Sequence, residues 1–215
     1  MVELKKVKGQ LKEELRLIEM ILIAAAYLLG SIPSGVWIGK AFFQTDIREH
    51  GSGNSGTTNT YRVLGKWAGT VVLIMDIAKG TLAVLLPIWF GVAIHPMIIG
   101  LFAIIGHVYP IFAGFKGGKA VATTAGVALG AQPLFVLVLI VLFAVILYTS
   151  SMVSLASVLT LIVAAIASLF VGDWIFTGIV WIAMILVVVR HRANIDRIRK
   201  GEENKVPFGL NQSRK

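Results

Sequence analysis

Six long apolar blocks constrain this chain more than any other feature of its sequence. Each block meets or approaches the roughly 20 apolar residues that an α-helix needs to cross a bilayer. Only 14% of the residues are charged, against about 25% in soluble domains. We therefore expect an all-α integral membrane protein rather than a very apolar soluble helical bundle. The blocks are 20–39, 67–90, 96–113, 133–149, 152–171 and 174–189.

The chain contains no cysteine, which excludes disulfides, thiol catalysis and thiolate metal sites. Its net charge of +9 would suggest nucleic acid as a partner of a soluble protein, but basic loops are ordinary in membrane proteins. We expect no nucleic-acid partner, no metal and no other cofactor. The first apolar block continues into Gly35, Trp37 and Lys40 without a convincing cleavage site, so we interpret it as a retained span.

Three polar segments carry most of the Lys and Arg residues, and the positive-inside rule places all three in the cytoplasm. They are 40–66, 113–119 and 190–215. The other connections, near 91–95, 131–133 and 172–173, contain no Lys or Arg.

This charge pattern sets the number of crossings. The chain must cross an even number of times between 119 and 190, so segment 120–150 must form two helices, broken at Gln132–Pro133. Residues 120–131 then form a short helix packed by small residues. We expect seven transmembrane helices, one of them short, with the N-terminus outside and the polar motifs on the cytoplasmic face. The alternative is six spans with the basic tail outside.

The ends of the chain differ from the apolar part. Leu4, Val7, Leu11, Leu15 and Ile18 recur at helical spacing among Lys and Glu, which predicts an amphipathic helix on the membrane surface over residues 1–19. A disordered polar extension is the alternative, and Met20 could itself be the initiator. We therefore divide the chain into this extension, a membrane domain over 20–200 and a polar tail over 201–215.

The first polar motif runs from Gly51 to Arg62. Glycines allow backbone conformations in which consecutive N–H groups form an anion-binding nest, and Arg62 can bind phosphate through two parallel hydrogen bonds. A flexible linker is the alternative, although few linkers alternate so regularly. The candidate ligands are Gly51, Ser52, Gly53, Asn54, Thr58, Asn59 and Arg62.

The second motif, around Lys116-Gly117-Gly118-Lys119, opens the short helix, and helix N-termini attract anions. The Walker pattern is absent, so this motif predicts no nucleotide site. His107 precedes it near the end of an apolar helix, where its position alone favours a structural role over a substrate contact.

The third motif, 190–197, places His191 and Asn194 on one helical face at i, i+3. Such a basic segment commonly anchors a last helix, but a His–Asn pair exceeds what anchoring requires. Asp76 and Lys79, also at i, i+3, predict an ion pair inside the membrane. Ser154 begins a span on the inner side and either caps it or reaches the site.

These residues resemble the bacterial acyl-phosphate:glycerol-3-phosphate acyltransferase family of the PlsY type. The resemblance rests on YLLGSIP at 27–33, GSGNxGxTNxxR at 51–62, GHxxPxFxxFKGGK at 106–119 and RHxxNI at 190–195. Ala120 and Thr57 depart from the usual Gly and Ala of the pattern, and the two ends of the chain fall outside it.

The resemblance implies a seven-span enzyme of the bacterial plasma (inner) membrane with a cytoplasmic active site. Its reaction is acyl transfer from acyl phosphate to the sn-1 hydroxyl of glycerol 3-phosphate, giving lysophosphatidic acid and phosphate as the first step of phospholipid synthesis. The implied partners are both substrates, the lysophosphatidic acid product, the lipid bilayer and a soluble enzyme that makes acyl phosphate.

The expected mechanism positions two anions and stabilises developing charge, without a covalent nucleophile. The expected catalytic residues are Ser52, Arg62, Lys119, His191 and Asn194, and the other candidates bind substrate. The leaving phosphate takes the hydroxyl proton, with His191 as the rival base. A transporter of a phosphorylated metabolite is the alternative function.

Overall fold

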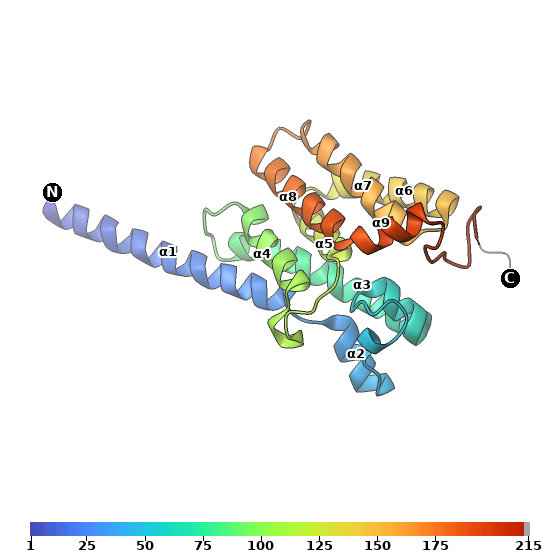
Figure 1. Ribbon diagram of the computed structural model, residues 1–215. Helices are drawn as coiled ribbons and strands as arrows, with labels where there is room; N and C mark the ends of the chain where they lie inside the picture. The colour runs from blue at the N-terminus through green and yellow to red at the C-terminus, as the bar shows by residue number, and fades with distance from the viewer. Residues whose placement is uncertain (213–215) are drawn as a thin grey trace.

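The structure, a computed structural model, describes residues 1–212, and within them every regular element is a helix. The arrangement is shown in Figure 1. Arg214 and Lys215 of the basic tail lie outside the described residues. The elements are α1 (Val2–Gly30), α2 (Ser34–Phe43), η1 (Ile47–Glu49), α3 (Thr57–Trp89), α4 (Pro96–Val108), η2 (Ile111–Ala113), α5 (Val121–Ala131), α6 (Pro133–Ser150), α7 (Val153–Ser168), α8 (Trp174–Arg190) and α9 (Arg192–Arg199).

Three of these segments are long and apolar enough to cross a membrane: α3, α4 together with η2, and α6. The count rises to five if the bent pairs α1–α2 and α8–α9 are each one span. The shorter helices α5 and α7 are also apolar. The chain is therefore all-helical with several membrane-compatible helices, as its apolar blocks predict.

The breaks between helices follow proline chemistry. Gln132 separates α5 from α6, and Pro133 begins α6, where its missing N–H removes no helical hydrogen bond. The helix break expected at Gln132–Pro133 is confirmed. Pro33 likewise follows the end of α1, because the residue before a proline is disfavoured in the helical region.

The short helix α5 packs closely across α3 through small residues. A side chain at Gly80 of α3 or at Gly126 of α5 would overlap backbone atoms of the facing helix. Thr81 uses this proximity, since its hydroxyl donates to the carbonyl oxygen of Gly126 at 2.8 Å. Close contact of this kind suits helix association in lipid, where van der Waals packing replaces the hydrophobic effect.

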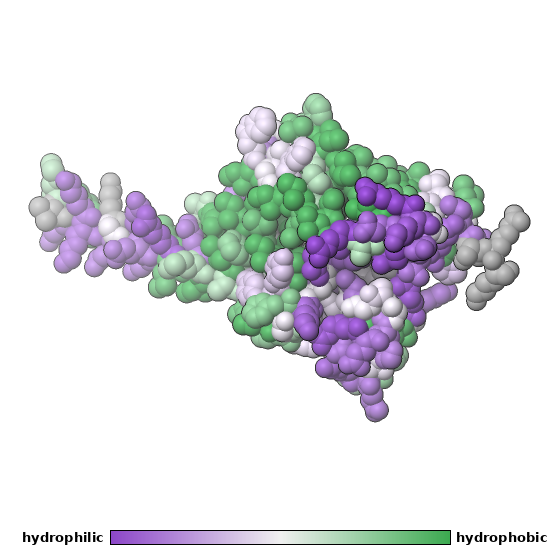
Figure 2. All heavy atoms as spheres, viewed as in Figure 1, coloured by the Kyte–Doolittle hydropathy of each residue, from purple (hydrophilic) through white to green (hydrophobic). Residues whose placement is uncertain are grey.

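Charged residues lie inside the helical bundle, and apolar residues cover much of its surface. Lys79 and Asp76 form an ion pair at 2.8 Å with side chains 5% and 2% exposed, which confirms the predicted pair. In contrast, Leu134, Val138 and Val141 of α6 are exposed. Figure 2 shows the same distribution, with hydrophobic residues over most of the bundle and hydrophilic residues gathered over α9 and near the connection from α2 to α3.

The N-terminal extension is not a separate element. Residues 2–30 form one continuous helix, which projects from the bundle at its N-terminal end (Figure 1). Residues 1–17 are exposed wherever their side chains are described. That the extension lies on a membrane surface remains a prediction.

Candidate active site

A polar pocket of about 590 Å³ collects residues from all three motifs. Five cationic side chains and two carboxylates contribute to its walls, so its charge favours anions. The lining residues are Asp46, Arg48, Glu49, Ser52, Gly53, Asn54, Phe115, Lys116, Gly117, Lys119, Arg190, Ala193, Asn194 and Arg197.

The glycine-rich loop before α3 is held in shape by Asn59. The Asn59 side chain is buried, accepts from the Ser52 N–H at 2.8 Å and donates to the carbonyl oxygens of Ile47 and Asn54 at 2.7 and 2.9 Å. Gly53 N–H is also bonded within the loop, to the His50 carbonyl at 3.1 Å. The expectation of an open backbone nest is therefore wrong at Ser52 and Gly53, because the Asn59 amide and the loop carbonyls already bond their N–H groups.

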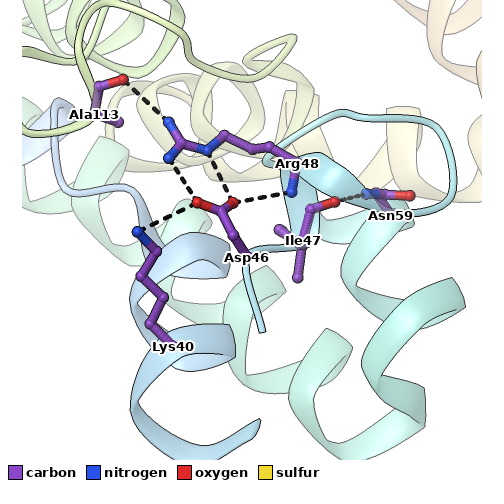
Figure 3. A network of polar contacts seen from close by, with 6 residues as sticks. All are labelled: Lys40, Asp46, Ile47, Arg48, Asn59 and Ala113. Carbon is purple, nitrogen blue, oxygen red and sulfur yellow. Dashed lines mark hydrogen bonds and ion pairs between the residues drawn. The ribbon is translucent and has the colours of Figure 1, made fainter. Parts of the chain in front are cut away.

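Arg48 connects this loop to the second motif. Its Nε and Nη2 bind both oxygens of Asp46 at 2.9 and 2.7 Å, and its Nη1 donates to the Ala113 carbonyl at 3.2 Å (Figure 3). Lys40 approaches the same carboxylate at 3.3 Å. The Arg48 guanidinium holds the pKa of Asp46 well below its usual range, so this carboxylate stays ionised.

The second motif packs against His107. Gly118 N–H donates to the His107 carbonyl at 3.2 Å, and the imidazole Nδ1 lies 3.1 Å from the Thr123 hydroxyl. His107 is buried and does not line the pocket. Arg190, at the end of α8, donates from Nη2 to the Gly117 carbonyl at 3.2 Å. The structure thus gives His107 a role in holding the loop that carries Lys116 and Lys119.

Lys119 reaches across the pocket to the third motif. Its ammonium donates to Oδ1 of Asn194, whose amide nitrogen donates to Glu203 at 2.6 Å. Glu203 also accepts from Ser154 at 2.8 Å and from Arg197 Nε at 2.8 Å. One buried carboxylate therefore orients Asn194 and fixes Arg197 at the pocket wall.

Burial changes the titration of the two groups that flank Asn194. Lys119 precedes α5, and burial lowers its pKa to about 8, with nearby arginines adding to the effect. His191 follows α8, and burial with the charge of Lys119 lowers its pKa to about 4. His191 Nδ1 lies 2.8 Å from the Val187 carbonyl, so this nitrogen carries the proton of the neutral ring and donates it.

The predicted site residues divide by position. Seven line the pocket: Ser52, Gly53, Asn54, Lys116, Gly117, Lys119 and Asn194. Eight others do not: Gly51, Thr58, Asn59, Arg62, His107, Gly118, Ser154 and His191. His191 is buried beside the pocket, and Arg62 is exposed, with its Cδ close to the position of a side chain on Gly51. The roles assigned to all of them stay predictions.

Six polar residues of the site were not singled out as candidates: Asp46, Arg48, Glu49, Arg190, Arg197 and Glu203. The two arginines of the third motif had a signal, since they flank His191 and Asn194 in the sequence. Glu203 had none, because it reaches the site only when the tail folds back, with Val206 N–H bonded to the Ser151 carbonyl at 2.8 Å.

The pocket offers five cationic side chains, which suit phosphate groups. Within residues 1–212, no three His, Asp or Glu side chains lie close enough together to hold a metal ion. Fold and pocket together define a helical membrane protein with a cationic pocket at the junction of three motifs.

The chain belongs to the glycerol-3-phosphate acyltransferase family, whose sequence profile matches residues 20–201. It is therefore an acyltransferase of phospholipid synthesis. It is 56% identical over 202 residues to the glycerol-3-phosphate acyltransferase of Streptococcus thermophilus (strain ATCC BAA-491 / LMD-9), with 89% of this chain and 95% of that protein covered. Its identity to the enzyme of Levilactobacillus brevis is 52%, with 90% and 96% covered.

Two crystal structures of PlsY (YgiH), an integral membrane glycerol 3-phosphate acyltransferase, have the same fold. The glycerol 3-phosphate form superposes with a TM-score of 0.83 at 36% identity and covers 87% of this chain and 94% of that one. The lysophosphatidic acid form gives 0.78 at 35% identity, with 86% and 94% covered. The expected family is confirmed.

Proposed function

We propose that this protein transfers a fatty acyl group from acyl phosphate to the sn-1 hydroxyl of glycerol 3-phosphate, releasing lysophosphatidic acid and inorganic phosphate. The observation that carries this proposal is the single pocket in which Ser52, Lys119 and Asn194 meet, each from a different motif. Relatives with the same fold are known in glycerol 3-phosphate and lysophosphatidic acid forms. A soluble enzyme that makes acyl phosphate is the proposed source of the donor.

The chemistry needs positioning more than covalent catalysis. The glycerol hydroxyl oxygen attacks the acyl carbonyl carbon, the bond between that carbon and the phosphate oxygen breaks, and phosphate leaves with the electron pair. Because a mixed anhydride is already activated, no enzyme nucleophile is required. Cationic side chains such as Lys119 and Lys116 bind the anions and stabilise the negative charge that develops.

The hydroxyl proton passes to the leaving phosphate in the proposed mechanism. The environment of His191 supports this choice over a histidine base, because burial and the charge of Lys119 lower its pKa to about 4. An effective general base has a pKa near the working pH. We assign His191 instead to the wall behind Asn194, where it excludes water.

The proposed topology has seven membrane crossings, with α1 and α2 forming the first and α8 the last. Seven apolar helical segments, counting α5 and α7, support this number. The N-terminus then lies outside, and the pocket opens to the cytoplasm of the bacterial cell, where the positive-inside rule places its basic loops.

Turnover of purified protein tests the function. The protein in detergent receives acyl phosphate with and without glycerol 3-phosphate, and released phosphate and lysophosphatidic acid are measured. Phosphate release that depends on glycerol 3-phosphate, with equal lysophosphatidic acid, is the expected result. Binding of glycerol 3-phosphate without turnover would favour a transporter of a phosphorylated metabolite.

A further inference from the structure

Arg190 lies where α8 ends and contributes to the pocket wall. Its Nη2 donates to the carbonyl oxygen of Gly117 at 3.2 Å, between Lys116 and Lys119. This contact fixes one edge of the guanidinium on the second motif. The rest of the group, Nε and Nη1, remains for other partners.

The arginines of the pocket differ in how their Nε atoms are bonded. Arg48 Nε donates to Asp46 at 2.9 Å, and Arg197 Nε donates to Glu203 at 2.8 Å. Arg190 Nε is buried and has no hydrogen-bond partner within residues 1–212. No ion pair of the described chain includes Arg190 either. Arg190 is thus the pocket arginine whose charge no carboxylate balances in the described structure.

A buried, unpaired N–H on a permanently charged group is costly, because the guanidinium cannot lose its proton. Native structures seldom keep such a group unless a partner arrives. The partner must be an acceptor and must suit a pocket with five cationic side chains. Phosphate meets both conditions, since its oxygens bind the planar fork of arginine through two parallel hydrogen bonds.

We propose that Arg190 binds a substrate phosphate directly through the unbonded N–H groups of its guanidinium, as an additional substrate-binding residue. The inference rests on the proposed function, which supplies phosphate groups from glycerol 3-phosphate and from acyl phosphate. Arg190 also lies near Lys119, whose pKa its charge helps to lower. Two cations this close are best accommodated by an anion that both contact.

A purely structural role makes a different prediction. If Arg190 only holds the Gly117 carbonyl, lysine can replace it, because an ammonium donates to a carbonyl and keeps the charge. If Arg190 binds phosphate through two N–H groups in the plane of its guanidinium, lysine cannot reproduce that geometry. Arg190→Lys therefore separates the two roles, and Arg190→Gln removes the charge as well.

The experiment compares Arg190→Lys and Arg190→Gln with Arg192→Lys and Arg192→Gln. Arg192 is the matched control, because it lies two residues away, is exposed and is absent from the pocket wall. Steady-state kinetics in detergent give the KM values of both substrates and the inhibition constant of inorganic phosphate. Thermal unfolding in detergent gives the shift on adding inorganic phosphate or glycerol 3-phosphate. We expect Arg190→Lys to raise the KM of one substrate about 10-fold, the loss typical of one charge-assisted hydrogen bond. Unliganded Tm stays unchanged, and the thermal shift with inorganic phosphate or glycerol 3-phosphate falls.

The substrate whose KM rises identifies the phosphate that Arg190 binds. The proposal is overturned if both KM values and the phosphate inhibition constant in Arg190→Lys stay within about 2-fold of the Arg192 variants. It is equally overturned if only kcat falls while the thermal shifts persist. Should Arg190→Gln fail to fold, Arg190→Lys alone decides. The wild-type protein could bind phosphate without catalysing turnover. In that case, loss of the phosphate-dependent thermal shift in Arg190→Lys would support phosphate binding by Arg190 and refute the proposed reaction.

Discussion

The ammonium of Lys119 donates to the side-chain oxygen of Asn194, joining two residues 75 positions apart in the sequence. The Asn194 amide nitrogen donates to Glu203 at 2.6 Å, which orients the amide so that its oxygen faces Lys119. Lys119 belongs to the second motif and Asn194 to the third. Their contact is therefore the point at which the loop before α5 is fixed to α9.

Replacing Asn194 by alanine should remove one of the contacts that join these two motifs. Lys119 loses its acceptor and Glu203 loses a donor, and an unsatisfied buried partner costs about 1–3 kcal/mol. We expect kcat/KM to fall roughly 10- to 100-fold in a protein that still folds. Asn204→Ala, at an exposed position beside Glu203, is the control and should retain wild-type activity. Equal rates in both variants would contradict the assigned role of Asn194.

The lowered pKa of Lys119 predicts an alkaline limit to activity. With a pKa of about 8, Lys119 is mostly charged at pH 7 and loses its charge as the pH rises through that value. Substrate phosphates are already dianions there, because their second pKa is about 6. We expect kcat/KM for glycerol 3-phosphate to fall above about pH 8.

Lys119→Arg provides the check on this pH profile. Arginine stays charged at every accessible pH, so the variant, even if slower, should lose the decline near pH 8. A decline that persists unchanged in Lys119→Arg would assign it to another group.

His191 should affect the rate without setting the pH profile. Its pKa of about 4 leaves the ring neutral from pH 5 upward, and its Nδ1 proton is held by the Val187 carbonyl. We expect His191→Ala to lower kcat/KM while the shape of the profile between pH 5 and 8 is preserved. Loss of an acid limb in this variant would instead favour His191 as the base. His50→Ala, which alters an exposed histidine, is the control.

Removing one member of the Asp76–Lys79 pair should destabilise the protein more than removing both. Both side chains are buried, Ser34 also donates to Asp76 at 2.9 Å, and Lys79 donates to the Ile32 carbonyl at 2.9 Å. Asp76→Asn leaves the lysine unpaired, at a cost of about 3–5 kcal/mol. Asp76→Asn with Lys79→Met should cost less, measured as thermal unfolding in detergent. A double variant that is less stable than Asp76→Asn alone would contradict this account.

Local patterns in the sequence predict much of this fold. Pro133 placed the boundary of α6, and the i, i+3 spacing of Asp76 and Lys79 predicted their contact. The positive-inside rule grouped the three basic motifs on one side, and members of each do line one pocket. The chain changes from polar to apolar near residue 20, where the sequence predicted a surface helix followed by a span. Helical periodicity is the same on both sides of this change, so it could not distinguish two separate helices from the single helix α1.

Contacts that depend on the tertiary fold were beyond these patterns. Glu203 reaches Asn194 only after the tail turns back against Ser151 and Tyr148, and no motif marks that turn. Asn59 was expected to bind substrate, yet its amide is used to close its own loop. The sequence shows which polar residues are available, whereas their hydrogen-bond partners are set by backbone geometry.

Gly118 should tolerate no side chain, because the His107 imidazole occupies the space that a side chain there would need. A methyl group there would overlap Nε2 of a ring that is buried and held near Thr123. Gly118→Ala should displace the loop that carries Lys119, raise the KM of a phosphate substrate about 10-fold or more and leave the helices folded. Gly178→Ala is the matched control, since no described atom beyond the chain neighbours and the adjacent backbone of its own helix lies within 4 Å of the added carbon, and its backbone is helical. Circular dichroism checks the fold and steady-state kinetics measure the KM. A Gly118→Ala enzyme with the KM values of Gly178→Ala would show that the loop does not depend on this contact.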